Sequence, residues 1–171
     1  MAQTAKKKTG LKELSKNNQP HNAVVEGLQT QVANAFIVYL NYKHYHWQTF
    51  GPLFRDLHLL FDEFATEVYE TIDVMAERVR MIGQDPVSHV EDFLKLATVK
   101  PAKKGNNMRN MIEEADTNAL VVIKGMREAI KKAESNDDPG SADVLIRFVQ
   151  IHEKHEWWLR DILEKRDGLT A

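Results

Sequence analysis

Apolar residues recur every three or four positions along long stretches of the chain, the spacing that places them on one face of an α-helix. The first stretch runs from about residue 22 to residue 49, and Gly51-Pro52 breaks it. The second stretch stops at Gly83. Its apolar positions are Leu57, Leu60, Phe61, Phe64, Val68, Ile72, Met75, Val79 and Ile82. We therefore predict two long helices joined by a short turn.

The second half of the chain predicts another pair of long helices, at about residues 108–134 and 141–165. Residues 136–140, Asn-Asp-Asp-Pro-Gly, separate them. Residues 84–107 form a long connection in which Ser88 and Glu91 have the spacing of a capping box, so we expect a short helix over residues 89–97. The pattern predicts an all-α, ferritin-like four-helix bundle with a short extra helix in the crossover between the second and third helices.

Composition agrees with one helical domain. The chain has 171 residues, of which 43% are hydrophobic, and its 8 glycines and 5 prolines favour long helices over many turns. It has no cysteine, which excludes disulfides and thiolate metal sites. We see neither an apolar leader at the N-terminus nor a run of about 18 apolar residues. We therefore expect a cytoplasmic protein that makes no use of a membrane.

Charge is distributed unevenly along the chain. The first 20 residues carry one glutamate and five lysines, Lys6, Lys7, Lys8, Lys12 and Lys16. We therefore divide the chain into a flexible lysine-rich tail, residues 1–20, and a bundle domain, residues 21–171. A basic arm on an acidic body is typical of tails that bind nucleic acid. The alternative is a solvated terminus without a ligand.

Five residues of metal-ligand type lie at and beyond the junction of the first two predicted helices: His46, His58, Asp62, Asp73 and Glu77. Steps of four residues place His58 with Asp62, and Asp73 with Glu77, on one face of the second helix. The eleven residues from Asp62 to Asp73 span roughly 16 Å of helix. The two pairs therefore cannot hold one metal within a single straight helix.

The two pairs are symmetric about a point between residues 67 and 68. If two copies of this helix pair antiparallel about a twofold axis at that point, each His58/Asp62 pair meets the Asp73/Glu77 pair of the other chain. On a helical wheel starting at His58, the ligand candidates fall between about 0° and 100° and the apolar residues near about 270°. The pattern predicts two metal sites per dimer, each shared between chains.

Two imidazoles and three carboxylates make a mixed nitrogen and oxygen ligand set. Such a set suits iron, manganese or zinc better than copper or calcium, and the residue types do not choose among these three. The alternative is that Asp62, Asp73 and Glu77 belong to an ordinary solvated helix face. The symmetric spacing of the whole set favours a metal site.

The other histidines carry weaker signals. None follows a glutamate by three residues, so the sequence lacks the Glu-x-x-His pairs of a di-iron site inside one bundle. His155 falls in the apolar stripe of the fourth helix and is expected in the core, whereas His152 is expected to be exposed. His44 and Tyr45 are candidates for an additional ligand or for an indirect partner of one.

The ligand pattern resembles a known family. His46-Trp47, His58-x-x-x-Asp62 and Asp73-x-x-x-Glu77 are similar to the ferroxidase signature of the Dps family (DNA-binding proteins from starved cells), the mini-ferritins. All five ligand positions match without substitution, and the resemblance covers roughly residues 22–165.

The resemblance implies a hollow homo-oligomer, a dodecamer, that oxidises Fe(II) with hydrogen peroxide and stores ferric oxide. It implies that His46, His58 and Asp62 of one chain act as catalytic and metal-binding residues with Asp73 and Glu77 of its mate. Trp47 matches the tryptophan that intercepts stray oxidising equivalents beside the site in this family.

Two further family traits apply to other parts of the chain. Family cages admit iron through acidic pores, and Glu113, Glu114 and Asp116 lie in a segment that resembles the pore region, where a ring of carboxylates would attract cations. Some members bind DNA through lysine-rich tails, which residues 1–20 resemble. Many tails on one cage would add avidity, and the acidic body would oppose it.

These observations favour a Dps-like ferroxidase and iron-storage cage, an oxidoreductase that protects the cell from oxidative damage. One alternative is a nucleoid-associated DNA-binding protein whose metal sites are vestigial. Another is a zinc-bound homologue with weak ferroxidase activity, since two histidines per site suit zinc.

Overall fold

The computed structural model describes residues 22–164, so the predicted tail and its lysines lie outside the described residues. Four long helices lie within these residues: α2 (Asn22–Gln48), α3 (Phe54–Met81), α5 (Met108–Ser135) and α6 (Pro139–Leu163). The short helix α4 (Val90–Leu96) lies in the crossover. The predicted fold class is confirmed, and no strand occurs between residues 22 and 164.

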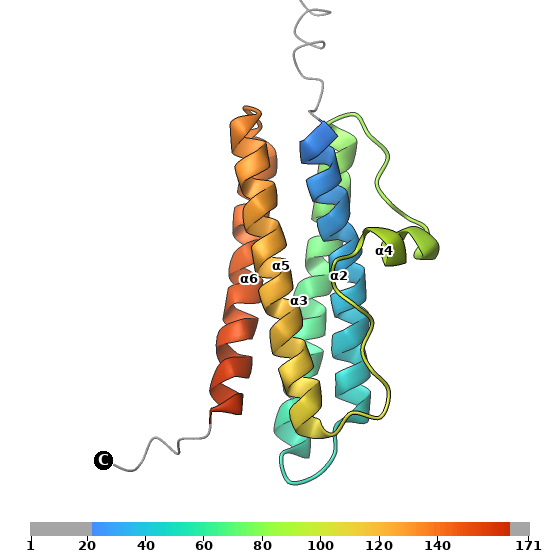
Figure 1. Ribbon diagram of the computed structural model, residues 1–171, viewed down its shortest axis with the longest axis vertical. Coiled ribbons are helices and arrows are strands. Elements are labelled where there is room, and N and C mark those ends of the chain that lie inside the picture. The colour runs from blue at the N-terminus through green and yellow to red at the C-terminus, as the bar shows by residue number, and fades with distance from the viewer. Residues whose placement is uncertain (1–21, 165–171) are drawn as a thin grey trace, which may run out of the picture.

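The helices pack as two antiparallel pairs, α2 with α3 and α5 with α6 (Figure 1). Helix α2 also contacts α5, and α3 contacts α6, which closes the bundle. The crossover runs along the bundle from the end of α3 to the start of α5 and carries α4 against the outer side of α2. The first pair therefore holds all five metal-ligand candidates.

Two side-chain amides of α2 hold the crossover in place. The Asn34 side chain accepts a hydrogen bond from the Thr98 backbone N–H at 2.8 Å. Two turns further along, the Asn41 amide donates to the Lys100 carbonyl at 2.9 Å and accepts from the Ala102 N–H at 2.7 Å. These bonds satisfy backbone groups that a long irregular segment would otherwise leave unpaired.

Helix α3 ends where the sequence predicts. Gly83 has a φ of +86°, a left-handed conformation that glycine adopts without steric cost. Its N–H donates to the Arg80 carbonyl at 2.9 Å, and the next N–H, of Gln84, donates to the Val79 carbonyl at 3.1 Å. These bonds satisfy the last carbonyls of the helix.

The start of α6 is fastened to the end of α3. The Asp138 carboxylate caps α6 by accepting from the Ser141 N–H at 3.0 Å. The Arg78 guanidinium donates to the same carboxylate at 2.6 Å and to the Ser141 hydroxyl at 3.0 Å. Among the described residues, no helix is long and apolar enough to cross a membrane.

Candidate metal centre

Helix α3 keeps its ligand candidates and its apolar residues on separate faces. His58 and Asp62 are half-buried at the start of the helix, and Asp73 and Glu77 are exposed further along it. The face toward the bundle is buried and consists of Leu57, Phe61, Phe64, Ala65, Val68, Thr71, Ile72, Met75 and Val79. The ligand face therefore points away from the interior of its own bundle.

His46, at the end of α2, and His58, on the first turns of α3, form a pair. Their rings are stacked with centroids 3.7 Å apart and an angle of 19° between planes. Nδ1 of His46 lies 2.6 Å from the His58 carbonyl, and Nδ1 of His58 lies 2.9 Å from the His46 carbonyl. Because a carbonyl oxygen only accepts, each Nδ1 carries a hydrogen and donates. In a neutral ring the lone pair is then on Nε2. This nitrogen is free to bind a metal.

Asp62 lies one turn after His58 and forms an ion pair with Lys43 of α2, with 2.6 Å between Nζ and Oδ1. The hydrogen bond from Lys43 holds the pKa of Asp62 below its usual value, against an opposing effect of burial. Lys43 also lies over the ring of Trp47, with its Nζ 5.7 Å from the centroid. Trp47 is 65% exposed and stands beside the candidate site.

The structure brings together His46, His58 and Asp62 at the junction of α2 and α3. Asp73 and Glu77 lie further along α3, as the spacing requires. Within residues 22–164, no group of three or more His, Asp or Glu side chains is arranged to hold a metal. The two rings lie parallel and the Asp62 carboxylate is paired with Lys43, so this end of α3 is not a complete site. The shared five-residue site stays a prediction.

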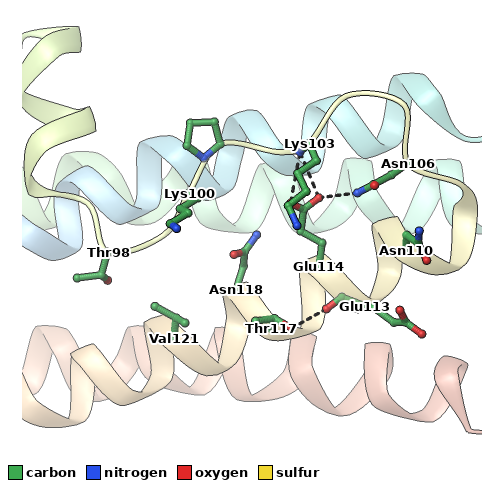
Figure 2. A pocket seen from close by; sticks show the side chains of 11 residues that line it. Thr98, Lys100, Lys103, Asn106, Asn110, Glu113, Glu114, Thr117, Asn118 and Val121 are labelled. Atoms are coloured by element: carbon green, nitrogen blue, oxygen red, sulfur yellow. Dashed lines mark hydrogen bonds between the residues drawn. The ribbon is translucent and has the colours of Figure 1, made fainter.

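Of the three carboxylates expected at a pore, Glu113 and Glu114 line one pocket beside the crossover, and Asp116 is not among its lining residues. Glu113 is exposed. Glu114 faces the crossover, where it accepts hydrogen bonds from the Asn106 amide at 3.0 Å and from the Lys103 N–H at 3.3 Å (Figure 2). Asp116 is partly buried, which raises its pKa. Within one chain Glu114 thus fastens the crossover to α5, and the pore assignment stays a prediction.

Two expectations about side-chain position are wrong. His152 is fully buried instead of exposed, and neither of its ring nitrogens has a hydrogen-bond partner among the described residues. Burial lowers its pKa to about 3. Tyr45 is also fully buried, with its hydroxyl toward Glu114 of α5, so it does not join His46 at the site. His155 lies in the core as predicted, and His44 is half-buried beside the Tyr45 ring.

Sequence reasoning missed Lys43 as a neighbour of the site. A signal was present, because Lys43 lies three residues before His46 and so shares its side of α2. A lysine one turn from a predicted ligand would therefore have been a reasonable candidate to pair with a ligand carboxylate.

Comparison with known proteins places the fold in one family. A model of the ferritin-like domain matches residues 25–168. The structure of a Dps from Thermosynechococcus elongatus is 47% identical with a TM-score of 0.83, and the match covers 86% of this chain and 94% of that one. DNA protection during starvation protein 1 from Deinococcus radiodurans is 32% identical over 142 residues, 82% of this chain and 69% of the relative. The DNA protection during starvation protein of Brevibacillus brevis is 34% identical over 137 residues, 80% and 92% of the two chains. This chain therefore belongs to the Dps family of ferritin-like proteins.

Proposed function

We propose that the protein is a cytoplasmic ferroxidase that oxidises Fe(II) with hydrogen peroxide at sites shared between chains and stores the ferric product inside a dodecameric cage. The observation that carries the proposal is the pair His46 and His58, each held by a backbone carbonyl, beside the carboxylate of Asp62. Membership of the ferritin-like family supports iron as the substrate. One peroxide takes one electron from each of two Fe(II) ions and, with two protons, leaves as water, which avoids the one-electron step that forms hydroxyl radical.

The residue types fit both oxidation states of iron. Nε2 of His46 and of His58 supplies neutral nitrogen ligands, and the low pKa of Asp62 keeps its carboxylate ionised. In the proposed dimer, Asp73 and Glu77 of the other chain complete the site. Their additional carboxylates favour the more highly charged ferric ion, since hard cations prefer oxygen ligands.

The middle of the ligand face supports the twofold pairing. Thr66 and Tyr69 are the exposed residues of this face between the two ligand pairs, and they too are symmetric about the point between residues 67 and 68. In an antiparallel dimer, Thr66 of each chain would lie opposite Tyr69 of the other. Tyr69 is 59% exposed and its ring lies 5.4 Å from that of Tyr39 on α2. An exposed aromatic residue at this place is typical of the centre of a protein interface.

A second apolar surface lies on the other side of α2, toward the crossover. It is a groove between α2 and α4 lined by Phe36, Ile37, Leu40, Asn41, Val90, Phe93, Leu94 and Pro101. Leu40, Val90 and Leu94 are 56%, 70% and 55% exposed. Contiguous apolar surface of this kind marks protein–protein contacts, which supports a homo-oligomer.

The test is anaerobic loading of metal-free protein with Fe(II), followed by one hydrogen peroxide per two Fe(II), with ferric absorbance as the readout. We expect oxidation well above the buffer rate in the wild type and the buffer rate in Asp73→Ala. Glu70→Ala is the matched control, because Glu70 is an exposed carboxylate of α3 outside the ligand set. A wild-type rate equal to that of buffer would refute ferroxidase activity.

DNA binding through residues 1–20 is a second candidate function, favoured by the five lysines of that segment. Curated relatives from Deinococcus radiodurans and Bacillus anthracis are named DNA protection during starvation proteins. The test is a gel shift of the full chain against a chain lacking residues 1–20, repeated at several salt concentrations. A salt-sensitive shift with the full chain that is absent with the chain lacking residues 1–20 would support binding by the tail. Equal shifts would exclude that role.

We also propose that zinc competes with iron for the same ligands. A Dps from Listeria innocua, 28% identical with a TM-score of 0.78, has a structure determined after soaking with zinc. Two imidazoles and a carboxylate suit zinc, which has no redox chemistry. Zinc added before Fe(II) should therefore suppress oxidation, and an unchanged rate in saturating zinc would exclude a shared site.

A further inference from the structure

A chain of hydrogen bonds crosses the interior of the bundle, apart from the candidate metal site. The Tyr42 hydroxyl of α2 lies 3.4 Å from Nδ1 of His155 on α6. Nε2 of the same ring lies 2.7 Å from Oε2 of Glu67 on α3. Glu67 is also paired with the ammonium group of Lys154. Residues of three helices thus form one hydrogen-bonded series of a phenol, an imidazole and a carboxylate.

The direction of these bonds follows from their chemistry. An ionised carboxylate only accepts, so Nε2 of His155 carries a hydrogen and donates to Glu67. Nδ1 then has the lone pair of a neutral ring and accepts from the Tyr42 hydroxyl. Burial lowers the pKa of His155 to about 4, so the ring is neutral at neutral pH. Burial alone would raise the pKa of Glu67, but its bonds with Lys154 and His155 outweigh this and lower it.

Tyr42 keeps its proton unless it also loses an electron. Its side chain is 1% exposed and is surrounded by apolar rings, with the centroid of Phe64 5.4 Å and that of Phe61 6.2 Å away. Burial raises the pKa of the Tyr42 phenol, and the charges of Asp116 and Glu67 raise it further. A phenol that loses an electron becomes a very strong acid, so its proton must then move to a base in contact with it. His155 is such a base.

We propose that Tyr42 is a redox-active tyrosine that gives one electron to a strong one-electron oxidant while its phenolic proton moves to Nδ1 of His155. The O–H bond of Tyr42 breaks and an N–H bond forms on His155. The products are a neutral phenoxyl radical, an imidazolium ion beside the Glu67 carboxylate, and an oxidant reduced by one electron. When the oxidant is hydroxyl radical, its product is hydroxide.

Tyr42 is close in sequence to the candidate metal site and packs among other aromatic rings. Tyr42 lies one turn before His46 on α2. Its ring centroid is 6.4 Å from that of Tyr45, which is 5.3 Å from that of Phe61. A single Fe(II) that reacts with peroxide forms hydroxyl radical, a strong one-electron oxidant. This source of the oxidant rests on the proposed function. One electron from a further Fe(II), with return of the proton from His155, restores the tyrosine. The redox property of Tyr42 is independent of that function.

Tyr45 provides a matched control within the same helix. It is also fully buried, and burial raises its pKa as well. Its hydroxyl, however, faces the Glu114 carboxylate of α5 and not an imidazole. The two tyrosines therefore differ in the group beside the hydroxyl, which is the His155 imidazole for Tyr42 and the Glu114 carboxylate for Tyr45.

The experiment uses metal-free, full-length protein and photogenerated tris(bipyridine)ruthenium(III) as the one-electron oxidant, with electron paramagnetic resonance and the transient phenoxyl absorption as readouts. We expect a neutral tyrosyl radical in the wild type and in Tyr45→Phe, and its loss in Tyr42→Phe. An undiminished tyrosyl signal in Tyr42→Phe, or tryptophan radicals alone in the wild type, would overturn the proposal.

A second variant tests the base without removing a ring from the core. In Glu67→Gln the amide oxygen still accepts from His155, but the charge that favours the imidazolium is lost. Because the base His155 remains and only the charge beside it is lost, radical formation should slow by up to the roughly 10²-fold that a positioned base contributes, and it should be slower in D2O than in H2O. Equal rates in Glu67→Gln and wild type would also refute the proposal. As no iron is present, failure of ferroxidase activity and failure of Tyr42 oxidation are separate results.

Discussion

Replacing Lys43 should strengthen metal binding at the candidate site. In the structure the Lys43 ammonium lies 2.6 Å from the Asp62 carboxylate, so a cation that binds Asp62 must first displace it. The substitution Lys43→Met keeps much of the length of the side chain and removes its charge. The stacked histidines and their backbone hydrogen bonds do not involve Lys43 and should persist.

The exposure of the two side chains sets the size of the effect. Lys43 and Asp62 are 20% and 48% exposed, so water screens the pair in part. Pairs of this kind contribute about 0.2–1 kcal/mol. Since 1.36 kcal/mol corresponds to a factor of ten, removing the pair should lower the metal dissociation constant by up to about fivefold. Loss of the repulsion between the ammonium and a divalent cation acts in the same direction and is weaker at high salt.

Calorimetric titration of metal-free protein with Zn(II), and anaerobically with Fe(II), measures this change. Lys124→Met is the matched control, because Lys124 is an exposed lysine of α5 outside the site. We expect tighter binding in Lys43→Met and an unchanged constant in Lys124→Met. Binding weakened in Lys43→Met alone would show that Lys43 orients Asp62 for the metal and would refute the competition.

Three other substitutions test separate parts of the account. Tyr69→Asp places a charge at the proposed twofold contact and should reduce the assembly mass measured by analytical ultracentrifugation; an unchanged mass would exclude this face. Asp138→Ala removes the cap of α6 and the partner of Arg78, so the free energy of unfolding in denaturant should fall by about 2 kcal/mol at neutral pH. Burial would raise the pKa of Asp138, but the bonds from Ser141 and Arg78 lower it overall. The stabilisation is therefore present above the ordinary pKa of about 4 and is lost as the pH falls through the lower folded value, where the variant and the wild type should converge. His152→Leu removes two buried nitrogens without partners among the described residues and should raise the free energy of unfolding by about 1 kcal/mol at pH 7. Because the pKa of folded His152 is about 3 and that of the unfolded chain about 6.5, wild-type stability falls as the pH drops below the unfolded value, and the variant should lose less; equal pH profiles would contradict the burial of a neutral ring.

The helices follow from local signals in the sequence. Gly51 and Gly83 both adopt a φ of +86°, and each lies at a break that the sequence marks with glycine. The periodicity of α3 also places the ligand candidates on the correct side, away from the buried residues. These features depend on a few neighbouring residues and can be predicted without the fold.

Contacts between helices could not be predicted in the same way. Lys43 and Asp62 are 19 residues apart, and Tyr42 and His155 are 113 apart, so periodicity gives the face of each residue but not its partner. The sequence predicts that His152 is exposed, and this is wrong. Helix α6 packs against both α5 and α3, so its buried surface is wider than one stripe and includes His152.

Co-assembly of two inactive chains tests most directly whether each metal site is shared between chains. One chain carries His58→Ala and the other Asp73→Ala, and each alone damages every proposed site. In a mixed dimer, one site receives both substitutions and the other receives neither. Random co-assembly should therefore restore peroxide-dependent Fe(II) oxidation to about a quarter of the wild-type level per chain. No recovery in verified mixed assemblies, or full activity in either variant alone, would contradict the shared site.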